Sequence, residues 1–218
     1  MRVVIAGGHG QIALRLAELL RRQGDEVIGL IRNPDHVDDV AAAGARGVVL
    51  DLESATVDDA SAVLTGADAA VFAAGAGPGS GIERKDTVDR AAAAKFAEAA
   101  ERAGVRRHVQ ISAMALERAG DPAVGEVFAA YLHAKAAAED DLRARDLDWT
   151  ILRPGRLMNE PGTGKVQLAE HAERAEVPRD DVAAVLLALL GEPRTAGRTL
   201  ELVSGDVAVA DAVAALAS

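Results

Sequence analysis

The 218-residue chain contains no cysteine, and this absence excludes disulfide bonds and a thiol nucleophile. Aromatic residues are scarce as well, at 2% of the chain. Because half of the residues are apolar, the core is expected to consist mainly of Ala, Val, Leu and Ile. The chain is long enough to bury one sizeable core of this kind.

Long apolar runs are also missing. No stretch reaches the roughly 20 apolar residues that span a bilayer, and the opening segment RVVIAGG lacks the pattern of a signal peptide. Positive charge is in deficit, since the formal net charge is −10, and this argues against nucleic acid or an anionic membrane as the main partner. We therefore expect a soluble cytoplasmic protein that acts on a small molecule, with no prediction of an oligomer.

Short β-rich segments alternate with longer amphipathic segments along the chain. Several of the short segments are apolar almost throughout, which is typical of strands buried on both faces of a sheet. This alternation predicts a single α/β domain over residues 1–218, with a Rossmann-type doubly wound parallel sheet of about seven strands and helices on both faces. The predicted strands cover residues 2–6, 26–31, 47–50, 69–74, 108–112, 149–153 and 199–203. The predicted helices include one that begins near Ile12 and others at 86–104, 126–146 and 178–191.

The segment AGGHGQIA lies between the first predicted strand and the first predicted helix. This is the position of a dinucleotide-binding turn, where glycines let the backbone approach a diphosphate and the helix N-terminus supplies N–H donors. Gly7 would permit the tight turn, Gly10 the close approach, and Ala13 the packing of helix on strand. The spacing departs from Gly-x-Gly-x-x-Gly, so an ordinary glycine-rich turn is the alternative. His9 would either contact a phosphate or be exposed, and the histidine spacing predicts no metal site.

The second predicted strand ends in GLIRNPDH, which bears on the choice of cofactor. A free ribose 2′-hydroxyl usually meets an Asp or Glu at this strand end, whereas a 2′-phosphate meets an arginine. Here Arg32 comes first, and Asp35 follows only after Pro34. Because a guanidinium recognises phosphate through paired donors, the sequence favours NADP(H) over NAD(H). The alternative is an exposed arginine at a strand end.

The chain's single tyrosine, Tyr131, precedes Lys135 by four residues in the segment YLHAK. One helical turn places both side chains on one face, where the ammonium would lower the pKa of the phenol and suit it to acid–base catalysis. A tyrosine packed on a helix beside a solvated lysine is the alternative. Ser112 ends a predicted strand, and its hydroxyl could hydrogen-bond a substrate oxygen or simply cap a turn.

Taken together, the segments GGHGQIA, LDLE, VFAAGAG, ISAM, YLHAK and ILRPGRL resemble, in this order, motifs of the short-chain dehydrogenase/reductase superfamily. The resemblance spans the chain. It is closest to the small atypical branch, with its NmrA-like and flavin or biliverdin reductase-like members, and to a group of bacterial NAD(P)H-binding proteins. The resemblance implies that Gly7, His9, Gly10, Gln11 and Ile12 bind diphosphate and Arg32 the 2′-phosphate. It further implies that Asp51 and Leu52 flank the adenine and that Ala73, Ala74 and Gly75 run along the cofactor. Pro154 and Gly155 would then lie near the nicotinamide. The catalytic residues that the resemblance implies are Ser112, Tyr131 and Lys135, and Lys135 would also bind the ribose.

The resemblance implies an NADPH-dependent oxidoreductase that reduces a small carbonyl, quinone or flavin-like substrate. Tyr131 would donate the proton, assisted by Lys135 and Ser112. Two alternatives stay open, namely an NADP(H)-binding redox sensor without turnover and an isomerase or dehydratase that uses bound nicotinamide transiently. The chain stops soon after the seventh predicted strand, so we do not expect a nucleotide-sugar substrate. The pocket is expected to form from loops near 75–85, 114–126 and 155–176.

Overall fold

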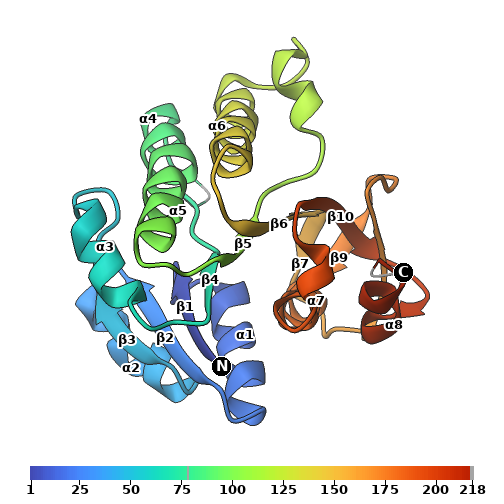
Figure 1. The fold of residues 1–218 in the computed structure, drawn as a ribbon. Helices are drawn as coiled ribbons and strands as arrows, with labels where there is room; N and C mark the ends of the chain where they lie inside the picture. Colours follow the sequence, from blue (N-terminus) through green and yellow to red (C-terminus); the bar gives the residue numbers. More distant parts are fainter. Residues whose placement is uncertain (78, 217–218) are drawn as a thin grey trace.

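The computed structural model describes residues 1–77 and 79–216, and within them nine strands form one sheet (Figure 1). Residue 78 of the expected loop 75–85 and residues 217–218 of the expected domain lie outside the described residues. The strands are β1 (Arg2–Ala6), β2 (Glu26–Ile31), β3 (Arg46–Val49), β4 (Ala69–Phe72), β5 (Arg107–Ile111), β6 (Asp148–Pro154), β8 (Lys165–Ala169), β10 (Arg198–Ser204) and β11 (Val207–Ala208).

The strand order is β11-β8-β10-β6-β5-β4-β1-β2-β3. All pairings from β3 to β10 are parallel, which confirms the doubly wound parallel sheet and its seven expected strands. The sheet continues past β10 with β8 and β11, which pair antiparallel and were not expected. A small separate ladder joins β7 (Arg156–Met158) to β9 (Glu176–Pro178). The segment 155–176, expected as a loop, therefore contains all of β7 and β8 and the first residue of β9.

Helices cover both faces of the sheet, as expected. On one face lie α1 (Gln11–Arg22), α7 (Arg179–Leu190) and α8 (Val209–Ala215); on the other lie α3 (Val57–Leu64), α5 (Ala93–Arg102) and α6 (Glu126–Arg143). The remaining helices are α2 (Val37–Ala42), α4 (Ile82–Arg84), the π-helix η2 (Lys85–Ala92), and the 3₁₀ turns η1 (Pro34–His36), η3 (Leu116–Gly120) and η4 (Pro193–Thr195). The expected helix 86–104 is thus a π-helix that continues as α5. No helix in the described part of the chain is long and apolar enough to cross a membrane.

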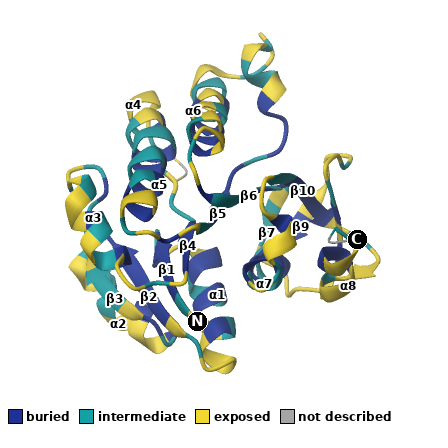
Figure 2. Ribbon diagram, in the orientation of Figure 1, coloured by how far each residue is buried: buried dark blue, intermediate teal, exposed yellow. Residues whose placement is uncertain are grey.

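The core follows the two-residue period of the strands. In β1, Val3 and Ile5 pack on the face of α1 and α7, whereas Val4 and Ala6 pack on the face of α3 and α5. All four side chains are buried, and Figure 2 shows the central strands as buried between more exposed helices. Burial on both faces explains why these strands read as continuous apolar runs.

A buried ion pair fastens α6 to the sheet. The Glu139 carboxylate, which is 0% exposed, accepts hydrogen bonds from Arg153 on β6 at 2.9 and 2.6 Å. Arg143 on α6 donates to the same carboxylate at 2.6 Å. Removal of one partner from such a buried ion pair destabilises the fold, because the remaining charges lose compensation.

We predict that Glu139→Gln lowers the free energy of unfolding by about 2 kcal/mol, because two partly buried guanidinium groups lose the buried carboxylate that they share. The matched control is Asp140→Asn, since this neighbouring carboxylate is mostly exposed and pairs with Arg143 at 3.1 Å. Its loss is expected to cost less than about 0.5 kcal/mol. Urea unfolding measures both variants, and equal destabilisation would contradict the role given to Glu139.

Candidate functional site

The turn between β1 and α1 brings bare backbone to the carboxyl end of the sheet. Gly7 has φ +77°, and a Cβ there would lie 2.7 Å from the Cα of Ala74. The N–H of Gly10 donates to the carbonyl of Gly7 at 2.8 Å, and α1 begins immediately after Gly10. The start of α1 has neither a capping side-chain hydrogen bond nor an acidic residue in its first turn. Its N–H groups and positive dipole end are therefore available to an anion.

A cavity of about 560 Å³ opens at this turn. This volume falls within the range of ligand-binding pockets. The cavity brings together most of the residues that were expected to bind a cofactor. They are Gly7, His9, Gly10, Gln11, Ile12, Arg32, Asp51, Leu52, Ala73, Ala74 and Gly75.

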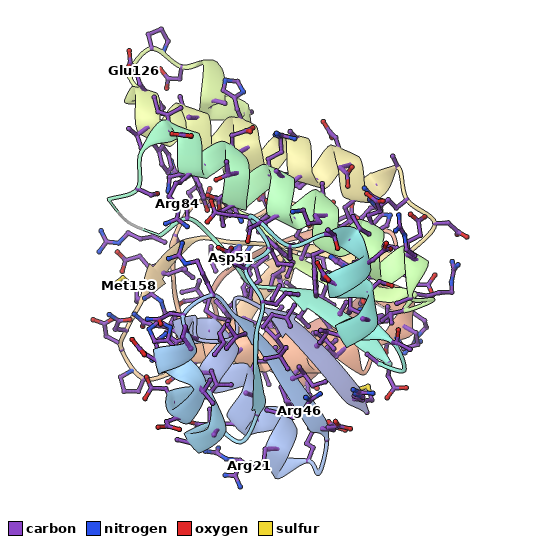
Figure 3. The ribbon with its side chains drawn as sticks, turned by 90° about the vertical axis from the view of Figure 1, so that its left-hand side faces the viewer. Arg21, Arg46, Asp51, Arg84, Glu126 and Met158 are labelled. Carbon is purple, nitrogen blue, oxygen red and sulfur yellow. The ribbon has the colours of Figure 1, made fainter. Side chains whose placement is uncertain are left out.

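The cavity is also lined by polar residues that the sequence analysis did not predict. Glu53 lies two residues after Asp51, Arg84 comes from α4, and Arg179 is the first residue of α7. Figure 3 shows Arg84 and Asp51, both labelled, on the same side of the molecule. In the sequence, Arg84 is marked only by its place in the segment GIERK, after the glycine-rich loop. The sequence does not predict its contact with Glu53, because that contact depends on tertiary structure.

His9 lies in the cavity wall and is not a fully exposed turn residue. Its ring stacks on His36 with centroids 3.6 Å apart, and its Nε2 lies 2.9 Å from an Asp39 carboxylate oxygen. Both histidines line the cavity. Within the described residues, no group of three or more His, Asp or Glu side chains is placed to hold a metal ion.

Lys135 and Tyr131 do come together, in a group of side chains outside the lining of this cavity. The Lys135 ammonium is buried, lies 5.8 Å from the centroid of the Tyr131 ring and donates to the carbonyl of Ile111 at 3.2 Å. It also pairs with the buried Asp89 carboxylate at 3.3 Å. Neither Tyr131 nor Lys135 is among the residues that line the cavity.

Asp89 connects this cluster to the cavity wall. One of its carboxylate oxygens accepts a hydrogen bond from the N–H of Ala76 at 3.3 Å, while the other pairs with Lys135. Gly75 and Ala76 both line the cavity, and a Cβ on Gly75 would lie 3.2 Å from Asp89. The tyrosine cluster therefore sits behind the wall formed by residues 75–76.

The expected effect of Lys135 on Tyr131 needs a correction. Burial raises the pKa of the Tyr131 hydroxyl, and the nearby Asp89 carboxylate raises it further. The pKa of this group is therefore shifted upward rather than lowered. The main physical reason is burial, which disfavours the charged phenolate, and the Asp89 carboxylate, which pairs with Lys135, adds to this effect.

A second lysine approaches the same tyrosine. The Lys85 ammonium lies 5.4 Å from the centroid of the Tyr131 ring and donates to the carbonyl of Gly77 at 3.0 Å. The Phe128 ring stacks on Tyr131 with centroids 5.8 Å apart. Tyr131 thus lies among an aromatic ring and two ammonium groups, an arrangement that the spacing of YLHAK did not predict.

The remaining expected site residues follow the carboxyl ends of β5 and β6. The Ser112 N–H donates to the carbonyl of Leu152 at 2.7 Å, which continues the β5–β6 pairing. The Ser112 hydroxyl oxygen is buried and finds no hydrogen-bond partner among the described residues. It does not cap a turn, which was the alternative to a substrate contact. Pro154 ends β6, is buried, and does not line the cavity.

Comparison with known proteins identifies the family to which this site belongs. The family model described as NAD(P)H-binding matches residues 7–193, which begin at the glycine turn. The chain belongs to this NAD(P)H-binding family. The assignment confirms the expected resemblance to small NAD(P)-binding proteins related to short-chain dehydrogenases/reductases. For this family member, a nicotinamide dinucleotide is therefore the class of cofactor.

Three similar proteins carry two kinds of description. YhfK of Bacillus subtilis (strain 168), described as an uncharacterised sugar epimerase, is 37% identical over 98% of this chain and 99% of its own. A Bacillus halodurans structure described as an NAD-dependent epimerase/dehydratase is 34% identical, with TM-score 0.89 over 99% of both chains. The oxidoreductase ylbE of Lactococcus lactis is 25% identical, with TM-score 0.85 over 99% of this chain and 96% of that chain.

The single tyrosine makes the ionisation of the site directly measurable. We predict that Tyr131 stays protonated well above pH ~10, where an exposed tyrosine is half ionised. The reason is that burial and Asp89 both disfavour the negatively charged phenolate. Ultraviolet titration of phenolate absorbance follows this group alone, with Tyr131→Phe as the blank.

In the same titration, Asp89→Asn is expected to lower the midpoint, because it removes a carboxylate and leaves Lys135 without its counter-charge. Asp86→Asn is the matched control, since that carboxylate is exposed on the same π-helix and pairs with Arg90. A midpoint near or below pH ~10 in the unmodified protein would contradict the assigned direction.

Proposed function

We propose that this protein is an NADPH-dependent oxidoreductase that reduces a small carbonyl, quinone or flavin-like substrate. The observation that carries the proposal is the cavity that extends from the open N-terminus of α1 to Arg32, with Lys135 and the neighbouring Tyr131 connected to its wall through Asp89. The oxidoreductase description of the similar Lactococcus lactis protein supports the same reading.

The residues present fit a nicotinamide dinucleotide. The N–H groups of Gln11 and Ile12, which no side chain caps, would hold the diphosphate where it passes Gly10, and Arg32 would bind a 2′-phosphate. In the same placement Asp51 and Leu52 would flank the adenine, Ala73, Ala74 and Gly75 would run along the cofactor, and Pro154 and Gly155 would lie near its nicotinamide end. When bound, NADPH supplies a hydride to the substrate.

The proton of the reaction would come from Tyr131. Reduction of a carbonyl adds a hydride to carbon and leaves a developing alkoxide, which is more basic than a phenolate and accepts the phenol proton. The Ser112 hydroxyl, buried and without a partner, would hydrogen-bond the same oxygen. Like any phenol, Tyr131 is protonated at neutral pH and can donate this proton, and its raised pKa makes it a weaker acid than an exposed tyrosine.

Epimerisation is the second candidate, because two of the similar proteins are described as epimerases. It would use the same cavity to oxidise and then re-reduce one carbon, with no net change in NADPH. Substrate conversion without any change in NADPH absorbance would support this candidate against the reductase.

The proposed position of the diphosphate is tested by adding a side chain to the glycine turn. We predict that Gly10→Val weakens NADPH binding at least about thirtyfold, because the side chain occupies the space that the diphosphate needs beside the N–H groups of α1, and charge-assisted hydrogen bonds contribute this much. Isothermal calorimetry measures the affinity. Unchanged affinity would remove the turn from the cofactor site.

Gly125→Val is the matched control for this variant. Gly10 and Gly125 are both helix N-cap glycines with φ −63°, and their ψ angles are 147° and 149°. A Cβ on Gly125 would meet nothing within 4 Å, and Gly125 does not line the cavity. The control therefore carries the same capping cost without the expected loss of NADPH.

The proton donor is tested by Tyr131→Phe. With a panel of small carbonyls and quinones, we predict a loss of at least about a hundredfold in kcat for carbonyl substrates, the usual contribution of a positioned acid. NADPH affinity should stay within about twofold, because Tyr131 does not line the cavity. Absorbance of NADPH follows turnover, and an unchanged kcat would remove Tyr131 from the mechanism.

A further inference from the structure

Glu53 is the meeting point of three donors from different elements. One of its carboxylate oxygens accepts from Arg84 of α4 at 2.8 Å and from Arg32, after β2, at 3.4 Å. The other oxygen accepts from the Thr87 hydroxyl of η2 at 2.6 Å. Arg32, Glu53 and Arg84 all line the cavity, so this group of charges forms part of its wall.

The loop that carries Glu53 is held in place independently of these donors. The Lys95 ammonium donates to the backbone carbonyls of Leu52 at 2.8 Å and Ala55 at 2.6 Å. The Asp51 carboxylate accepts from the N–H of Glu53 at 3.0 Å. A fixed backbone means that the Glu53 carboxylate is preorganised against the two guanidinium groups.

Two guanidinium groups on one carboxylate are more than a cofactor with a free 2′-hydroxyl requires. A ribose hydroxyl is recognised by a carboxylate alone, whereas a phosphate recruits arginines. The Thr87 hydroxyl, followed by Arg84 and Arg32, lowers the pKa of the Glu53 carboxyl, so Glu53 is an anion at neutral pH. It satisfies the arginines in the way that a phosphate would, and it repels a phosphate that approaches them.

We propose that Arg84 joins Arg32 in binding the ribose 2′-phosphate of NADP(H), and that Glu53 is the internal anion which this phosphate must displace. Glu53 and Arg84 together then set the preference of the cavity between a 2′-phosphate and a 2′-hydroxyl. This inference rests on the proposed binding of a nicotinamide dinucleotide in the cavity. Neither residue needs to touch the nicotinamide or the substrate, so both determine specificity and not the chemical step.

Two small probes isolate the group in question. Adenosine 2′,5′-bisphosphate and 5′-AMP differ only by the 2′-phosphate, and neither depends on turnover. Calorimetry at one fixed ionic strength compares both probes, together with NADPH and NADH, on the 218-residue chain. Thermal unfolding of each variant verifies that it is folded.

For Arg84→Gln, binding of adenosine 2′,5′-bisphosphate is expected to weaken about tenfold, the factor that one charge-assisted phosphate contact supplies. Binding of 5′-AMP should stay within about twofold. Glu53→Gln is expected to act in the opposite direction and tighten adenosine 2′,5′-bisphosphate about tenfold, because both arginines are released and a repulsive charge is removed. The ratio of NADPH to NADH affinity should move in parallel.

The matched controls make the same charge changes outside the cavity wall. Glu83→Gln alters the carboxylate next to Arg84 in sequence, and Arg90→Gln alters an arginine that pairs with Asp86. Neither residue lines the cavity. Both are expected to leave the ratio of the two probe affinities unchanged, which separates a local contact from a change in net charge.

An equal effect of Arg84→Gln on both probes would overturn the inference, because Arg84 would then contact the adenosine in general. Weaker binding of adenosine 2′,5′-bisphosphate to Glu53→Gln would overturn it as well. If the unmodified protein binds NADPH or NADH and neither variant shifts the ratio, only this inference fails. If the unmodified protein binds no probe and no dinucleotide, the proposed function fails, and the inference fails with it.

Discussion

The structure depends on direct contact between three backbone segments beneath the first turn. A Cβ on Gly7 would lie 2.7 Å from Ala74, after β4, and one on Gly8 would lie 2.6 Å from Gly29, within β2. Contacts this close require residues without side chains. Because the turn is held against the neighbouring strand ends, α1 starts at the carboxyl edge of the sheet, where open α/β sheets bind ligands. The cavity follows from this one packing constraint.

Asp89 gives the site its second constraint, because one carboxylate serves both halves. Its contact with Ala76 fixes the cavity wall, and its pairing with Lys135 compensates the ammonium beside Tyr131. The same carboxylate therefore contacts both the cavity wall and the ammonium beside the tyrosine. The π-helix η2 supplies Asp89, Lys85 and Thr87, so this irregular segment contributes to the tyrosine cluster and to the Glu53 cluster alike.

Local patterns in the sequence were sufficient to predict the features that depend on residues close together in the chain. The seven parallel strands, the glycine turn and the proximity of Tyr131 to Lys135 were all readable, because period and spacing determine them. The antiparallel strands β8 and β11 were not, because β11 has only two residues and β8 follows the glycine-rich segment NEPGTG, which favours a loop. The pKa of Tyr131 and the Glu53 cluster were also out of reach, because Asp89 and Arg84 approach through tertiary contacts that no motif encodes.

The protonation state of Tyr131 bears on the choice between reduction and epimerisation. Epimerisation by transient oxidation begins with removal of a substrate proton, so it needs a base at the start of the cycle. Reduction of a carbonyl instead needs a protonated group that donates to the developing alkoxide. Burial and Asp89 keep the phenol protonated, and Lys135 is committed to Asp89 rather than to a phenolate. An epimerase would therefore have to supply a different base or rearrange the Asp89–Lys135 pair, whereas a reductase can use the arrangement as it stands. This difference favours reduction, although relatives with similar sequences are described as epimerases.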